Sequence, residues 1–216
     1  MARKNLSLTL AFMNTKGGCG KSLLAYNVAG MVADQGYRVV LLDADRQGSA
    51  WEMYRARTRE LPFTVQHVPD SLDEALTHRS EEVTIVDSPP NHDEIAMILM
   101  DRMDTLVIPM NPTPQDLRAT TALLPLLRHS QMKRTPPPRV LFVFNRVRPR
   151  LAIVETMYTL ADRLGVFPTI SIPETCAFQE ASFAGLPLHR WEADHKAVTA
   201  IELLTQEVTG WPNDKS

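Results

Sequence analysis

Short apolar runs alternate with longer helical patterns along this chain to about residue 172. Several apolar runs show no polar residue at alternate positions, which is typical of parallel strands that are buried on both faces. The runs predict strands at Leu6–Met13, Arg38–Leu42, Val83–Val86, Thr105–Met110, Val140–Phe144 and Thr169–Ile172.

The segments between these runs have apolar residues at helical spacing. They predict helices at Lys21–Gln35, Ala50–Arg59, Ser71–His78, Glu94–Met100, Pro114–His129 and Ala152–Leu164. Ser71 and Glu74 form a capping-box pattern, while Gly36 and Gly165 are expected to end helices. The alternation of strand and helix predicts an α/β fold, a doubly wound and mostly parallel sheet flanked by helices.

Composition narrows the class of protein. The chain has 216 residues and a net charge of -2, so we expect one domain over residues 1–216 and no wholesale polycation. The two cysteines, Cys19 and Cys176, lack metal-ligand spacing, which favours a cytoplasmic setting. No apolar run approaches the length of a membrane span, and the first apolar stretch, which contains Asn14, is expected to be a strand rather than a signal peptide.

A glycine-rich segment, Asn14 to Ser22, joins the first predicted strand to the first predicted helix. This context is typical of a phosphate-binding loop, in which backbone N–H groups curl around an anion at a helix N-terminus. Lys21 is expected to reach the β- and γ-phosphates and Ser22 to bind Mg²⁺. The expected nucleotide-binding residues here are Lys16, Gly17, Gly18, Cys19, Gly20, Lys21, Ser22 and Leu23.

Acidic residues follow the next two strands. Asp43 and Asp45 come after the second strand, and Asp87 ends the strand Val83–Val86 in a Walker B pattern. The carboxyl ends of strands are where α/β proteins bind ligands, so these acids are expected to meet Mg²⁺ and the attacking water. The sequence thus predicts a P-loop site that binds a nucleotide and Mg²⁺, with Ser22, Asp43 and Asp87 as metal ligands.

The loop departs from the usual spacing, because Thr15 stands where a glycine is common and Lys16 adds a second lysine. In this it resembles the deviant Walker motif of the ParA/MinD family of P-loop ATPases. The resemblance implies that Lys16 reaches across a dimer interface to the partner's nucleotide and that Asp45 positions the attacking water. Lys16, Lys21 and Asp45 are therefore the expected catalytic residues.

The resemblance extends from about residue 6 to residue 188. It implies that Asn145 recognises adenine, with Arg146 and Pro173 at the nucleotide and Glu174 bordering the base. Because the loop begins at residue 14, the chain is most similar to short ParA-type proteins without an N-terminal helix-turn-helix domain. Leu23 replaces a hydroxyl residue of the family, and Arg46 replaces the proline of its first switch loop.

Charge is segregated within the chain. Between Asp116 and Glu155 there are eight cationic residues and no acid, which suggests one positive face that could bind DNA without reading its bases. Basic residues near the C-terminus also contribute in the resembled family. The candidates are Arg128, Lys133, Arg134, Arg148, Arg150, Arg190 and Lys196. The alternative is a solvated basic surface that balances acids elsewhere.

Together these features predict a ParA-like ATPase that dimerises on ATP, binds nucleoid DNA non-specifically and hydrolyses ATP, stimulated by a partner protein, to position a cargo. A MinD-like membrane-cycling ATPase is one alternative, but the acidic run Ala200–Val208 argues against a membrane-binding helix. A small-substrate enzyme on the same fold is a further alternative, and paired cysteines for a metal-cluster carrier are lacking. Cys19 is open to two interpretations, a thiol with a lowered pKa or a small residue at a variable position.

Overall fold

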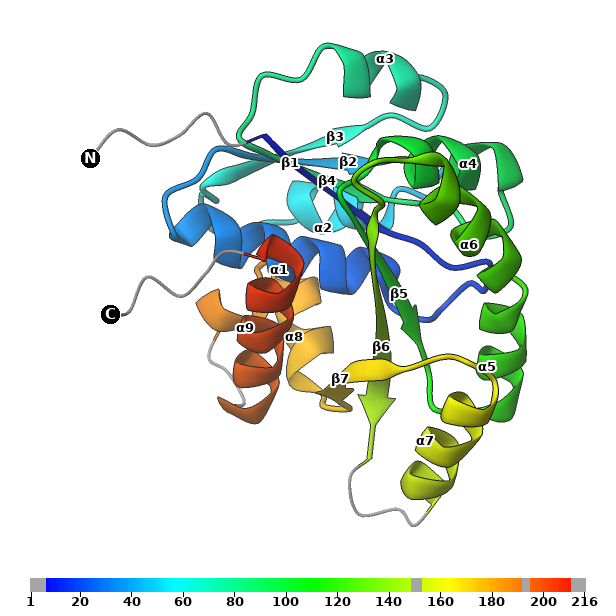
Figure 1. Cartoon of the computed structure of the whole chain (residues 1–216). Helices are drawn as coiled ribbons and strands as arrows, with labels where there is room; N and C mark the ends of the chain where they lie inside the picture. The colour runs from blue at the N-terminus through cyan, green and yellow to red at the C-terminus, as the bar shows by residue number, and fades with distance from the viewer. Residues whose placement is uncertain (1–6, 149–152, 192–194, 211–216) are drawn as a thin grey trace, which may run out of the picture.

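The computed structural model describes residues 7–148, 153–191 and 195–210. These residues form a seven-stranded sheet in the order β3-β2-β4-β1-β5-β6-β7, and every strand pairing is parallel (Figure 1). The strands are β1 Leu8–Phe12, β2 Val39–Asp43, β3 Phe63–His67, β4 Val83–Asp87, β5 Thr105–Met110, β6 Arg139–Val147 and β7 Pro168–Pro173.

Both faces of the sheet are covered by helices, as Figure 1 shows. The helices are α1 Lys21–Asp34, α2 Ser49–Arg55, α3 Leu72–Thr77, α4 Asp93–Arg102, α5 Pro114–Thr121, α6 Leu124–Lys133, α7 Ile153–Arg163, α8 Ala177–Phe183 and α9 His195–Thr209, with the 3-10 turn η1 Leu188–Arg190. Residues of α1, α2, α8 and α9 join one apolar core, and residues of α3 to α7 join the other.

Strand residues alternate between the two cores because successive side chains leave a strand on opposite faces. Leu10 and Phe12 of β1 enter the core under α1, whereas Ala11 enters the core on the opposite face. All five residues of β2 and of β4 are buried. Continuous apolar strands are therefore required, and the predicted doubly wound fold is confirmed.

The structure corrects several predicted elements. The edge strand β3 was missed because only Phe63 and Val65 are buried in it, while the remaining side chains are polar and exposed. Helix α8 was also missed, and so was α9, most of whose length was treated only as an acidic run. The capping-box prediction is wrong, since the side chain of Ser71 makes no capping hydrogen bond to α3.

The single helix predicted over Pro114–His129 is two helices, α5 and α6. Pro125 lies in the first turn of α6, and proline has no N–H to continue a helical hydrogen-bond ladder. The junction tightens instead, with the Leu123 N–H donating to the carbonyl of Thr120 (3.0 Å). By contrast, Gly36 and Gly165 follow α1 and α7 at positive φ, as expected for helix stops.

Candidate nucleotide-binding site

The site is built on the carboxyl ends of neighbouring strands. Register pairs Phe12 with Asp87, Asp87 with Asp43 and Asp43 with His67, so these four residues form one row across β1, β4, β2 and β3. The phosphate loop leaves the sheet one residue beyond Phe12. The predicted lysines and acids are thus brought to one edge of the sheet by parallel pairing.

The phosphate loop has the backbone shape that its glycines allow. Gly20, the residue before α1, has φ of +97°, a conformation that side-chain-bearing residues rarely adopt. A Cβ atom at Gly20 would also overlap the side-chain amide of Asn145. Lys21 opens α1, is only 6% exposed, and donates from Nζ to the carbonyl of Lys16 (3.3 Å). Lys21 therefore curls back over the loop.

Two buried carboxylates lie beside this loop, and their environments differ. Asp43 accepts hydrogen bonds from the backbone N–H groups of Asp45 (3.1 Å) and Trp51 (2.9 Å). Burial nevertheless raises the pKa of Asp43. Neither carboxylate oxygen of Asp87 has a hydrogen-bond partner among the described residues, although Asp87 is fully buried.

Burial, followed by the charge of Asp43, raises the pKa of Asp87 to about 8, and the Ser22 hydroxyl and Lys21 oppose this rise. A buried carboxyl without partners fits a site for a hydrated cation. No group of three or more His, Cys, Asp or Glu side chains arranged for a metal occurs among the described residues. The carboxylate of Asp87 and the hydroxyl of Ser22 suit Mg²⁺, which is commonly held by one or two carboxylates, waters and substrate phosphates.

Lys16 has a different environment from Lys21. Its ammonium forms an ion pair with the carboxylate of Asp116, and the Lys16 side chain is 40% exposed while that of Asp116 is 1% exposed. Asp116 also accepts from the backbone N–H of Asn111 (2.9 Å) and from the hydroxyl of Thr113 (3.0 Å). Burial raises the pKa of Asp116, but the ion pair and these hydrogen bonds outweigh it and the pKa is lowered.

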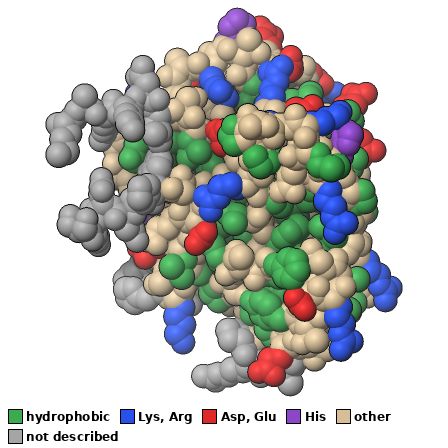
Figure 2. Space-filling view, in the orientation of Figure 1, with side chains coloured by type: hydrophobic (Ala, Val, Ile, Leu, Met, Phe, Trp, Pro, Cys, Tyr) green, Lys and Arg blue, Asp and Glu red, His purple; other side chains and the backbone are tan. Residues whose placement is uncertain are grey.

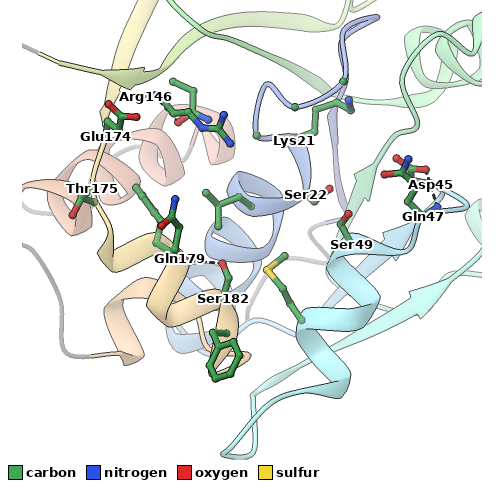
Figure 3. A pocket seen from close by; sticks show the side chains of 18 of the residues that line it. Lys21, Ser22, Asp45, Gln47, Ser49, Arg146, Glu174, Thr175, Gln179 and Ser182 are labelled. Carbon is green, nitrogen blue, oxygen red and sulfur yellow. Dashed lines mark hydrogen bonds between the residues drawn. The ribbon is translucent and has the colours of Figure 1, made fainter.

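A cleft of about 840 Å³ extends from the phosphate loop, which is within the size range of small-molecule sites. The sequence-predicted residues that line it are Gly17, Gly18, Gly20, Lys21, Ser22, Leu23, Asp45, Asn145, Arg146, Pro173 and Glu174. Figure 3 shows Lys21 and Ser22 between two walls, one with Asp45, Gln47 and Ser49, the other with Arg146, Glu174 and Thr175. The cleft brings together residues that lie as far apart in sequence as Gly17 and Phe183.

Asn145 contacts both the phosphate loop and Arg146 on one wall of the cleft. It is 1% exposed, its side-chain amide donates to the carbonyl of Cys19 (2.8 Å), and its Oδ1 accepts from the N–H of Arg146 (2.9 Å). Arg146 has φ of +56°, an uncommon conformation for a residue with a side chain. Asn145 therefore holds both the phosphate loop and Arg146, and its recognition of adenine stays a prediction.

The hypothesis of an activated Cys19 thiol is wrong. Cys19 is fully buried, and burial raises its pKa although the charge of Lys21 acts in the opposite direction. Its Sγ lies 3.4 Å from the carbonyl of Lys16. The alternative, a small residue that fits within the loop, agrees with this position.

Acids from elsewhere in the chain reach the predicted basic face. Three DNA-binding candidates are ion-paired: Arg134 with Asp104, Arg148 with Glu174 and Arg190 with Asp34. Figure 2 likewise shows acidic side chains among the basic ones on the face in view. Arg128, Lys133 and Lys196 are exposed, and Arg150 lies outside the described residues. Acids from other segments therefore offset part of the charge of the predicted basic face at these three positions, and DNA binding by this face stays a prediction.

Several residues at the cleft were not predicted. Met53 of α2 and Phe178, Gln179 and Ser182 of α8 line its far end, where the missed helix α8 forms a wall. Phe178 does lie within the stretch, from about residue 6 to residue 188, over which the sequence resembles the ParA/MinD family, so a signal for this wall was present. His67, which contacts the carbonyl of the cleft residue Asp45, carried no such signal, because β3 itself was not predicted.

No helix of the described residues is long and apolar enough to cross a membrane. Comparison with known proteins places the chain among nucleotide-binding domains. A family model described as the CobQ/CobB/MinD/ParA nucleotide binding domain matches residues 10–188.

The chain is 31% identical over 212 residues to the maintenance of carboxysome distribution protein A of Halothiobacillus neapolitanus, covering 94% of this chain and 97% of that protein. It is 32% identical over 203 residues to the protein of the same name from Gloeobacter kilaueensis, with 88% and 91% covered. The solved structure of the septum site-determining protein MinD with Mg-ADP from Pyrococcus horikoshii matches with a TM-score of 0.72 at 19% identity, covering 97% of each chain. That last match shows a shared fold.

Proposed function

Because the chain belongs to the CobQ/CobB/MinD/ParA family of nucleotide-binding domains, we propose that it is an Mg²⁺-dependent ATPase that dimerises on ATP and positions a cargo. One observation carries this proposal. Two lysines leave a single glycine-rich loop beside the unpartnered carboxylate of Asp87, and Lys21 is buried over the loop while Lys16 is 40% exposed.

The residues divide the chemistry between them. Lys21 and the N–H groups of the loop hold the β- and γ-phosphates, and Asp45 orients the attacking water. Ser22 and Asp87 hold Mg²⁺, directly or through water. Asp43 supports the loop that carries Asp45. Bound Mg²⁺ supplies positive charge that offsets the charge on the transferred phosphoryl group. Phosphoryl transfer to water needs positioning and charge, and these residues provide both.

Lys16 is proposed to act across a dimer interface. In the free chain it is held by Asp116, so crossing to a partner's phosphates exchanges one anion for another. An exposed ammonium gains more from a triphosphate than from one carboxylate, because the phosphates carry several charges. ATP would therefore favour the dimer, and hydrolysis would return Lys16 to Asp116.

The proposed cargo is a protein assembly. Two relatives that match over most of their length are named for carboxysome distribution, which supports this class over a plasmid or a chromosome. An adaptor protein on the cargo would stimulate hydrolysis, because a partner can add a group that stabilises the charge of the transition state.

The dimer is proposed to hold non-specific DNA, which places the protein on the nucleoid. Arg128 and Lys133 of α6 are the strongest candidates, because both are exposed and neither forms an ion pair with an acid in the part of the chain that the structure describes. Lys196 of α9 is also exposed. The membrane-cycling alternative is disfavoured, since α9 buries Ala197, Ile201 and Leu204 in the core beside α1.

The test is binding to a random DNA duplex with ATP, with ADP and without nucleotide, at about 50 and about 200 mM salt. We expect binding with ATP alone, weakened by salt and lost in Lys16→Ala. Light scattering in the same samples reports dimerisation. A matched pair of variants removes two cations each: Arg128→Ala with Lys133→Ala, and Arg134→Ala with Arg148→Ala.

The first pair should reduce DNA affinity about tenfold, and the second, whose arginines already face carboxylates, much less. If ATP drives dimerisation but DNA is ignored in every state, the DNA part of the proposal is wrong. If ATP neither binds nor is hydrolysed, the whole proposal is wrong.

A further inference from the structure

The loop between β2 and α2, residues 44–48, carries the proposed water-positioning residue Asp45. Two hydrogen bonds within the loop hold its turn in shape. The Gln47 N–H donates to Asp45 Oδ1 (3.0 Å), and the Gly48 N–H donates to the Asp45 carbonyl (2.9 Å). The start of the loop is also tied to the sheet, because the Ala44 N–H donates to the carbonyl of Asp87 (2.9 Å) and the Asp45 N–H donates to Asp43 Oδ1 (3.1 Å).

The edge strand β3 supplies a further attachment, to the carbonyl side of Asp45. Register places His67, the last residue of β3, beside Asp43, the last residue of β2. The His67 Nε2 lies 2.9 Å from the backbone carbonyl oxygen of Asp45. Because a carbonyl only accepts, Nε2 carries the proton of this hydrogen bond.

The same imidazole covers the end of the loop. Gly48 has φ of +63°, and the space beside its Cα faces the His67 ring, whose nearest atom lies 3.4 Å from where a Cβ would stand. A second attachment joins Arg46 to Asp70, just beyond β3. Both of its partners are largely exposed, at 78% and 67%, so this ion pair contributes little.

We propose that His67 is a positioning residue for ATP hydrolysis, which holds the Asp45 loop against the sheet through the Asp45 carbonyl. This inference rests on the proposed function. Arg46 occupies the position where the resembled family has a proline, whose ring would stiffen the loop by fixing φ. In this chain the missing covalent constraint is replaced by a hydrogen bond from a neighbouring strand.

A positioning role predicts a particular kinetic pattern. The contact is made to the loop and not to the phosphates, so its loss should lower kcat and leave the KM for ATP nearly unchanged. Loss of one hydrogen bond of this kind corresponds to about a fivefold to tenfold lower kcat. Arg46→Ala, which removes only the exposed ion pair, should change kcat less than about twofold.

The experiment compares His67→Leu, which has no donor, with His67→Gln, whose side-chain amide can donate to the same carbonyl. His78→Leu, at the exposed end of α3, is the control. Steady-state ATP turnover gives kcat and KM, and amide hydrogen exchange follows residues 44–48. We expect His67→Leu to lower kcat and to speed exchange at Gln47 and Gly48, with His67→Gln restoring most of both and His78→Leu changing neither.

Unchanged kcat and unchanged loop exchange in His67→Leu would overturn the inference. So would a variant whose exchange rises throughout the sheet with a lowered Tm, because that result indicates a general structural role. If the wild-type chain hydrolyses no ATP, the proposed function fails. Hydrogen exchange in the loop still tests the attachment in that case.

Discussion

The two ends of the cleft, the proposed phosphate end at the glycine-rich loop and the proposed base end at Arg146, Glu174 and Gln179, are constructed differently. At the phosphate end Lys21, the first residue of α1, is 6% exposed, and Asp87, the last residue of β4, is fully buried. At the base end Arg146, Glu174 and Gln179 are exposed and come from β6, from the segment after β7 and from α8. Because the side chains of the first end are buried, we expect substitutions there to cost more.

The largest effect is expected for Lys21→Ala. Lys21 is a buried cation whose nearest partner is a neutral carbonyl, so most of its interaction energy becomes available only to phosphate. We expect ATP affinity to fall about 100-fold, as for loss of a hydrogen bond between charged groups. Titration with a fluorescent ATP analogue measures it, with Lys133→Ala, on exposed α6, as the control. A loss below about threefold would show that the phosphate end is not preorganised.

The next largest effect concerns pH and Asp87. Its pKa is raised to about 8, so the folded chain keeps this proton in a range where the unfolded chain has lost it. Stability of the nucleotide-free protein should therefore fall as pH rises from about 4 to about 8. Asp87→Asn removes this contribution and should raise the free energy of unfolding at pH 8 by about 2 kcal/mol or more.

Urea unfolding of both proteins at pH 5 and pH 8 without Mg²⁺ measures this difference. At pH 5 the two should be closer in stability than at pH 8. Equal pH slopes for the variant and the wild type would contradict a protonated buried carboxyl. The same variant should lose Mg²⁺-dependent hydrolysis, because an amide binds Mg²⁺ less well than a carboxylate.

A smaller effect, on the link between the two ends, is expected for Gly20→Ala. The new methyl group overlaps the Asn145 amide, and alanine disfavours φ of +97°. We expect a loss of stability of about 2 kcal/mol, measured by urea unfolding. In an Asn145→Ala background the steric part should disappear and only the backbone strain remain, about 1 kcal/mol. Additive losses would mean that Asn145 does not restrain the loop.

The smallest effect is expected at the base end, for Arg146→Ala. This side chain is exposed and lines the cleft, so we expect ATP affinity to fall about threefold, which is typical of a solvent-screened contact. GTP should be bound with a similar change, since no contact to a specific base edge is removed. A loss of ATP affinity as large as that of Lys21→Ala would show that the two ends contribute equally to ATP binding.

Local patterns in the sequence predicted the phosphate end well. The glycine loop, Asp43 and Asp87 each follow a buried strand directly, and parallel pairing must then bring them to one edge. The base end was predicted only through a resemblance, and α8 was missed. Its seven residues include only two that are buried, which is too little for a recognisable helical pattern.

The sequence by itself determined six of the seven strands, the alternation of strand and helix, the loop that can bind phosphate and the acids next to it, because these depend on residues adjacent in the chain. The tertiary structure decided which charges meet. Lys16 with Asp116, Arg148 with Glu174 and His67 with the Asp45 carbonyl are joined only after the strands have paired. Such contacts depend on distance in space, which register and helix packing set and which local spacing does not record.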